Sequence, residues 1–193
     1  MEDDLLNMIS FSDKWVAASV RKDPRREFLE DPIGVLDGVR EKNRGVVIQI
    51  FDASCVVSVK QIHATTVAAH LAFKAGTNIS RKFEIELLVR LAADTQINRV
   101  LDKLGVRSDT EEIGCCVVAG SRDKVLKASK DLLQEIGGEE IKESELRSED
   151  RLKKAMEFYG ITESEVKSVQ AQTRYEAILL LILERIATLD LRR

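Results

Sequence analysis

The sequence predicts one domain of the α/β (α+β) class, in which several helices cover a small mixed sheet. Short apolar, β-branched runs such as residues 45–52 and 113–119 are typical of strands, and stretches with helical periodicity lie between them. The chain has 193 residues, of which 44% are hydrophobic, so it is long enough to bury one sizeable core. Because no second core is visible, we predict a single domain over residues 1–193.

The strands are predicted from β-branched and alternating residues. Residues 14–21 alternate between two faces, whereas residues 45–52 form a nearly continuous apolar run. Such a run is typical of a strand covered on both faces, as in a β-α-β arrangement. Residues 5–11 fit either an edge strand or a lead-in to the first strand.

The helices are predicted from their start and stop signals. Asp31 and Pro32 suit a cap followed by proline at the first helical position. Further starts are predicted by two capping boxes and a serine cap, at Ser58 with Gln61, at Thr162 with Glu165 and at Ser121. Glycines end several of these helices, at positions 76, 137–138 and 160.

Residues 78–106 predict a buried helical hairpin. Ser80 is the expected N-cap of a first helix that is apolar over most of its circumference, as interior helices are. Polar residues at 94–95 break it, and a second amphipathic helix follows from Ile97. Gly105 is expected to end this second helix in a left-handed conformation.

The C-terminal third predicts a charged surface connector at residues 139–149 and then a long C-terminal helix. The apolar surface of that helix is wider than one core-facing stripe. Two explanations remain open: the helix is the buried centre of a bundle, or it forms a groove for a partner.

The composition excludes several classes of protein. The net charge is −3, so no global field attracts nucleic acid or an anionic membrane. The acidic N-terminal residues do not resemble a signal peptide, and no apolar run is long enough to span a membrane. We therefore expect a soluble, cytoplasmic protein whose three cysteines are buried thiols.

No residue pattern supports catalysis, a cofactor or a metal. His63 and His70 are seven residues apart, whereas metal-binding pairs on helices favour a spacing of four, and no third ligand lies near. Phosphate loops, dinucleotide fingerprints and nucleophile elbows are absent from the sequence. We expect no enzyme activity, and the alternative is a stand-alone enzyme whose site uses one of these histidines and scattered carboxylates.

Three runs in the hairpin resemble a known family: Glu86-Leu87-Leu88-Val89-Arg90, Gln96-Ile97 and Lys103-Leu104-Gly105-Val106. The chain is similar to the small accessory subunit of the KEOPS complex, the TPRKB family of p53-related protein kinase-binding proteins, in its archaeal form. Residues 51–76 and 184–189 resemble the same family.

The resemblance implies a non-catalytic subunit that binds a small atypical kinase/ATPase. The family's complex installs threonylcarbamoyl on the adenine next to the anticodon of tRNA. Archaeal members also contact the 3′ CCA end of tRNA. The resemblance further implies that this subunit is associated only indirectly with the other KEOPS subunits. A local patch with stacking and backbone contacts is sufficient for such a single-stranded end, so a net negative charge does not exclude it.

Two sets of residues are predicted as partner contacts. The kinase is expected to contact Tyr175, Ile178, Leu179 and Ile182. The tRNA end is expected to contact Arg81, Arg90, Arg99 and Lys103. Many archaeal members carry Ser-Gly and then an arginine before the Gln-Ile pair, where this chain has Ala92-Ala93 and then Asp94 and Thr95. This departure favours, as an alternative, a regulatory kinase-binding module that does not bind tRNA.

Overall fold

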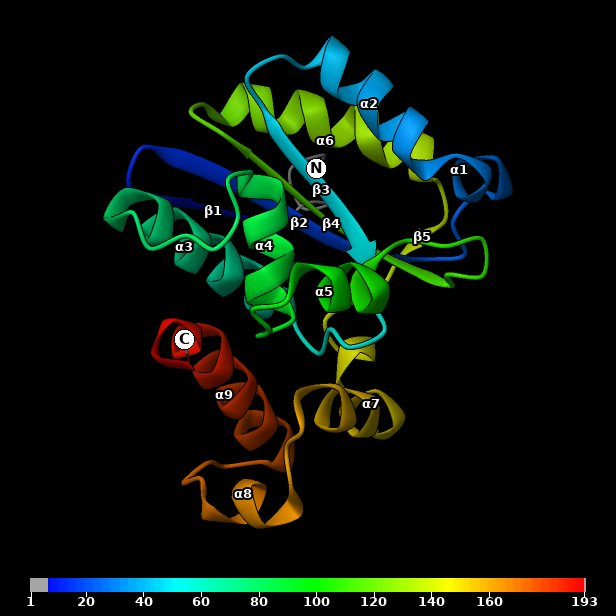
Figure 1. The fold of residues 1–193 in the computed structure, drawn as a ribbon. Helices are drawn as coiled ribbons and strands as arrows, with labels where there is room; N and C mark the ends of the chain where they lie inside the picture. The colour runs from blue at the N-terminus through cyan, green and yellow to red at the C-terminus, as the bar shows by residue number, and fades with distance from the viewer. Residues whose placement is uncertain (1–6, 193) are drawn as a thin grey trace. The chain divides into compact units, whose positions relative to one another are not determined.

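The computed structural model describes residues 7–192 and confirms the mixed α/β class. The chain divides into two compact units, one within residues 1–53 and 105–141 and the other within residues 54–104 and 142–193. The first unit contains the sheet, and the second is helical (Figure 1). The single domain expected from the sequence stays a prediction.

The sheet of the first unit has the strand order β1-β2-β4-β3, and the short β5 pairs with β2. Its strands are β1 (Asn7–Phe11), β2 (Lys14–Lys22), β3 (Val47–Asp52), β4 (Glu112–Ala119) and β5 (Glu139–Glu140). β1 pairs with β2 from Asn7 to Phe11, which confirms an edge strand there, whereas Leu5 and Leu6 lie outside the described residues.

The expectation of a mixed sheet with a β-α-β arrangement is wrong. All pairings between described strands are antiparallel, including β3 with β4, where Ile50 lies opposite Cys115. Consecutive residues of β3 from Ile48 to Phe51 are buried on both faces, as the apolar run indicated. Burial on both faces does not depend on strand direction, so the run could not distinguish the two pairings.

Three helices belong to the sheet-bearing unit: α1 (Arg26–Glu30), α2 (Pro32–Lys42) and α6 (Arg122–Ile136). Figure 1 shows α2 and α6 together over one face of the sheet, where Val125 and Leu132 join a core that includes Ile48 and Cys115. Asp31 caps α2 by accepting from the backbone N–H of Gly34, with Pro32 at the first helical position, as predicted.

The three cysteines are buried free thiols, as expected. Burial raises the pKa of Cys115 to about 12, and the neighbouring Cys116 contributes in the same direction. A thiol with so high a pKa is protonated at neutral pH and is a poor nucleophile. Cys115 is therefore a core residue of the sheet.

The helical unit is built around α3 (Val59–Ala75), which packs against α4 (Phe83–Leu91) and α9 (Arg174–Ala187). The other helices are α5 (Ile97–Leu104), α7 (Glu149–Tyr159), α8 (Glu163–Ser168) and the short 3₁₀ turns η2 (Glu145–Arg147) and η3 (Leu189–Arg192). The predicted hairpin is α4 and α5, and Ala93 breaks it with a φ of 49°. Gly105 is not among the residues with positive φ, so its predicted left-handed stop is wrong.

Local capping predictions were met to different degrees. Thr162 and Glu165 form the full reciprocal box at α8. Ser58 caps α3, but its hydroxyl accepts from the N–H of Lys60, and Gln61 accepts from Val57, so the second box does not form. The expected cap at Ser80 is displaced as well, because α4 begins after Lys82.

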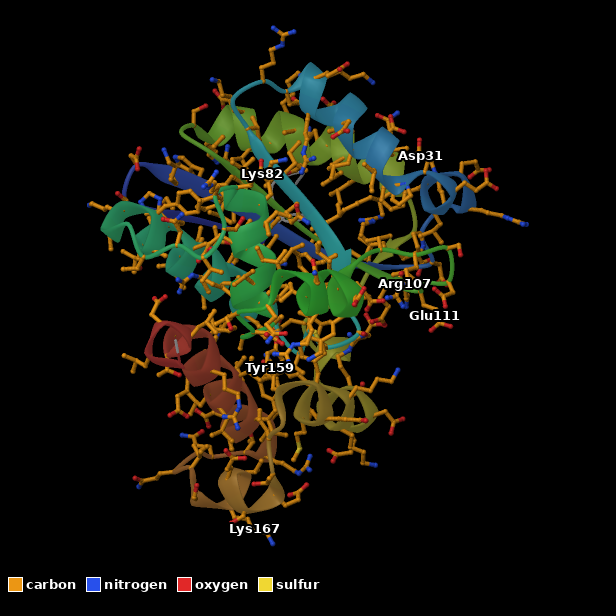
Figure 2. All side chains as sticks on the ribbon, in the orientation of Figure 1. Asp31, Lys82, Arg107, Glu111, Tyr159 and Lys167 are labelled. Atoms are coloured by element: carbon orange, nitrogen blue, oxygen red, sulfur yellow. The ribbon has the colours of Figure 1, made fainter. Side chains whose placement is uncertain are left out.

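Tyr159, at the end of α7, joins three parts of the helical unit (Figure 2). Its hydroxyl donates to the carbonyl of Leu91 at 2.5 Å and accepts from Nε2 of Gln61 at 2.7 Å. Burial raises the pKa of Tyr159 well above its usual value, so the hydroxyl keeps the proton that it donates. Gln61 is thus held at both ends, with Nε2 donating to Tyr159 and Oε1 accepting from the N–H of Val57, so its oxygen is not available to the N–H of Ser58.

The Glu165 box predicts a specific pH dependence of stability. The backbone N–H of Thr162, followed by Arg185 and the Thr162 hydroxyl, lowers the pKa of Glu165 to about 2, against 4.5 for the free side chain. A carboxylate whose pKa is lower in the folded than in the unfolded protein stabilises the fold above pH 4.5. This stabilisation is lost as the pH falls towards 2. Glu165→Gln should therefore lower Tm by a few degrees at pH 7, with the gap closing between pH 5 and pH 2, as measured by thermal unfolding.

Glu157→Gln on α7 is the matched control for this prediction, because that exposed carboxylate makes no capping box. Its Tm should follow the wild type at each pH. A constant gap for Glu165→Gln over this range would contradict the assignment.

Candidate partner-binding site

The four residues predicted to contact a kinase lie on the inner side of α9. Ile178 and Ile182 are fully buried, Leu179 is nearly so, and Tyr175 is half-buried. α9 packs there within the helical unit, where α3, α7 and α8 are its neighbours. The contact stays a prediction, but a substitution at Ile178 or Ile182 would disturb the core before it reported on binding.

The outer side of α9 has a second apolar stripe. Leu180 is 43% exposed, Leu183 is partly exposed, and Ala187 is exposed. Their spacing of three and four residues places them on one helix face, together with Glu176 and Glu184. We call Leu180, Leu183 and Ala187 the α9 stripe. Counting the helical period from Leu180 instead of Tyr175 would have found it in the sequence.

The neighbouring helix α3 also directs apolar side chains outward. Ala64, Val67 and Ala68 are partly exposed, and Leu71 is 57% exposed. These residues again recur at spacings of three and four, and we call them the α3 stripe. Two helices that pack against each other thus each present apolar side chains to solvent.

One carboxylate connects the first turns of α3 and α9. Glu143 accepts from the Ser58 hydroxyl at 2.6 Å, from the backbone N–H of Val59 at 3.1 Å and from the Tyr175 hydroxyl at 3.3 Å. The guanidinium of Arg147 lies 4.6 Å from the Tyr175 ring centroid. A carboxylate at a helix N-terminus is favoured by the free N–H groups and the helix dipole. Tyr175 therefore holds α9 in place beside α3.

The segment that carries Glu143 was predicted to be a charged surface connector. The structure places β5 and η2 in residues 139–149, with Ile141 and Leu146 buried. The charged residues are mostly exposed, as expected, but two apolar side chains and Glu143 fix the segment. It is a structural element of the fold.

Arg90, one of the predicted tRNA contacts, is buried. Its side chain is 2% exposed. Its Nε donates to Glu86 Oε1 at 2.9 Å, and its two terminal nitrogens donate to the two carboxylate oxygens of Asp190 at 3.2 and 2.9 Å. We call Glu86, Arg90 and Asp190 the Arg90 clamp. All three guanidinium nitrogens are engaged inside the helical unit.

Arg99 and Lys103 meet at Asp94. The carboxylate accepts from Arg99 at 2.8 Å, and the Lys103 ammonium lies 3.9 Å away. Partial burial by itself would raise the pKa of Asp94, but the hydrogen bonds from Arg99 and from the backbone of Gln96 outweigh it and lower that pKa. Lys103 also lies 5.3 Å from the centroid of the Phe158 ring. Arg81 is exposed in the loop before α4.

A shallow cavity of about 350 Å³ adjoins the Phe158 ring, lined by Ser54, Cys55, Lys154, Glu157 and Phe158. Over residues 7–192, no group of three or more histidines, cysteines or acids is arranged to hold a metal. His63 and His70 are partly exposed on α3. None of the helices in this range is long and apolar enough to cross a membrane.

Comparison with protein families gives a match over residues 30–190. It is the family described as kinase binding protein CGI-121. The chain belongs to the CGI-121 family. The match includes both helices that carry the apolar stripes, as well as Glu143 and the Arg90 clamp. No curated protein matches the chain.

The Glu143 contacts predict the energetic role of the 139–149 segment. Glu143→Ala removes the acceptor for two groups at the start of α3 and for Tyr175. We expect the free energy of unfolding to fall by about 1–2 kcal/mol, the usual cost of losing a helix cap, as measured by urea unfolding. Lys153→Ala is the control, since its exposed pair with Asp150 contributes little. Equal effects of the two substitutions would contradict this role.

Proposed function

We propose that this protein is a non-catalytic KEOPS subunit of the archaeal type, cytoplasmic, which binds the small atypical kinase/ATPase of that complex. The observation that carries the proposal is the pair of solvent-facing apolar stripes in a chain of the kinase-binding CGI-121 family. Contiguous apolar patches on a protein surface often mark a site that a partner covers, and the two stripes lie on helices that pack against each other.

The chemistry of the α9 stripe indicates what the kinase surface must offer. Leu180 and Leu183 supply an apolar centre, and Glu176 and Glu184 on the same face supply negative charge. A complementary partner surface is apolar in the middle and carries lysine or arginine around it. The buried Ile178 and Ile182 support this face from behind.

Replacing exposed apolar residues by acids tests the docking proposal. Leu180→Glu and Leu71→Glu should each weaken kinase binding at least about tenfold, because a buried unpaired charge replaces an apolar contact. Both side chains are exposed in the free protein, so Tm should change little. The measurement is isothermal titration calorimetry with the partner kinase, alongside thermal unfolding.

Ile33→Glu on α2 is the matched control, because Ile33 is 71% exposed and lies in the sheet-bearing unit. It should bind the kinase as the wild type does. Loss of binding in Ile33→Glu together with normal binding in Leu180→Glu would place the kinase on the other unit.

A second proposed activity is recruitment of tRNA through its 3′ CCA end for threonylcarbamoyladenosine modification. The supporting observation is Lys103 over the Phe158 ring, beside Arg99 and the cavity that Lys154 lines. Single-stranded ends are held by aromatic stacking and basic side chains, and this corner offers both. Arg81 remains a proposed tRNA contact. Arg90 is buried, so any effect that it has on tRNA binding is indirect, through the fold of the helical unit.

Asp94 predicts how strongly this corner binds an anion, because its carboxylate offsets the charge of both Arg99 and Lys103. Asp94→Asn should strengthen binding of tRNA with an intact CCA end about three- to tenfold, and Arg99→Ala with Lys103→Ala should remove most of it. The measurement is filter binding at several salt concentrations, with CCA-trimmed tRNA as the ligand control.

Lys167→Ala is the protein control, since this exposed lysine lies on α8 (Figure 2). Its tRNA affinity should equal that of the wild type. If wild-type binding is absent, or survives trimming of the CCA end, the protein is instead a regulatory kinase-binding module.

A further inference from the structure

We propose that the Arg90 clamp holds the C-terminal turn η3 in place, so that Leu191 extends the kinase-docking surface of α9. This inference rests on the proposed kinase binding and adds to it a contact residue, Leu191, and two positioning residues, Arg90 and Asp190.

The inner half of the clamp is rigid. Glu86 Oε2 accepts from the backbone N–H groups of Ile79 and Ser80, both at 2.8 Å, and its other oxygen accepts from Nε of Arg90. The Glu86 side chain is fully buried. With both carboxylate oxygens occupied, Glu86 fixes the plane of the guanidinium, and the two terminal nitrogens point in one direction.

The outer half of the clamp holds η3. Both terminal nitrogens of Arg90 donate to Asp190, one to each carboxylate oxygen. A two-point contact of this kind sets orientation as well as distance. A lysine could not reproduce it, because an ammonium is a point charge without a fixed fork.

The residues on either side of Asp190 differ sharply in burial. Leu189 is 1% exposed, whereas Leu191 is 83% exposed. In a 3₁₀ turn with about three residues per turn, successive side chains point in different directions. Burial of Leu189 and the ion pair of Asp190 thus leave Leu191 projecting into solvent.

Leu191 continues the α9 stripe in sequence. Leu180, Leu183, Ala187 and Leu191 follow one another at spacings of three, four and four residues. Glu176 and Glu184 border the same face, so the occupant we infer is the kinase surface with an apolar centre and basic surroundings. A short turn that no contact holds in place has to be ordered during binding, and the cost of ordering it weakens affinity.

Arg90 itself cannot contact a partner, because its side chain is 2% exposed. Any effect of Arg90 on binding is therefore indirect, and the position of η3, which Arg90 holds through Asp190, is the route that we infer. A double-mutant cycle can therefore distinguish an effect on the position of η3 from the direct contact that we assign to Leu191.

The cycle compares Asp190→Ala, Leu191→Ala and the double variant of the full chain, by calorimetric titration with the partner kinase. We expect each single substitution to weaken binding about fivefold, and the double variant to be no weaker than Leu191→Ala alone, because both remove the same contact. Without kinase, hydrogen exchange of the amides at 188–191 should be at least about tenfold faster in Asp190→Ala than in the wild type.

Ile62→Val is the control for stability alone, because it opens a small space in the core of α3 without touching the clamp. It should lower Tm and leave the kinase affinity unchanged. Unchanged affinity or exchange in Asp190→Ala, or additive effects in the double variant, would overturn the clamp while leaving kinase binding intact. If the wild-type chain binds no kinase, the proposed function fails, and the docking role of Leu191 fails with it.

Discussion

The helical unit depends on one carboxylate, that of Glu143, which is placed at the N-terminus of α3 by a segment 84 residues away in sequence. The N–H groups there would otherwise lack helical partners, so a charged acceptor satisfies them and opposes the helix dipole. The same carboxylate receives the hydroxyl of Tyr175 at the start of α9. Because Glu143 contacts the first turns of both α3 and α9, the α3 stripe and the α9 stripe are held in fixed positions relative to each other.

On α9, the residues predicted to contact a kinase lie on the inner side of the helix, and the outer side carries a second apolar stripe. A helix that is apolar on most of its surface has an inner and an outer apolar stripe, and periodicity does not say which one faces the core. The packing of α3, α7 and α8 decides this, and it buries Ile178 and Ile182 while leaving Leu180 exposed. The sequence left two explanations open, a bundle centre and a partner groove. The inner face of α9 is the bundle centre, and the outer face is the one that we propose for a partner.

The features that sequence predicted well are those set by near neighbours. The Asp31–Pro32 start and the Thr162–Glu165 box follow from residues within three positions of each other. The direction of β3 relative to β4 and the ion pair between Arg90 and Asp190 depend on residues 60 or more positions apart. Arg90 lies in a helix between apolar neighbours, and that burial was a signal for an internal ion pair rather than a surface contact.

Charge explains how such a protein can favour a protein partner over a polyanion. The net charge is −3, and the basic residues nearest Phe158 share the carboxylate of Asp94. Long-range steering of an anionic ligand is therefore weak, and recognition depends on contacts made after encounter. For the kinase contact that we propose, the side chains available are the apolar ones of α3 and α9, whose burial would not depend on salt. In the corner that we propose for tRNA, one acid would adjust binding instead, because the carboxylate of Asp94 offsets the charge of Arg99 and Lys103.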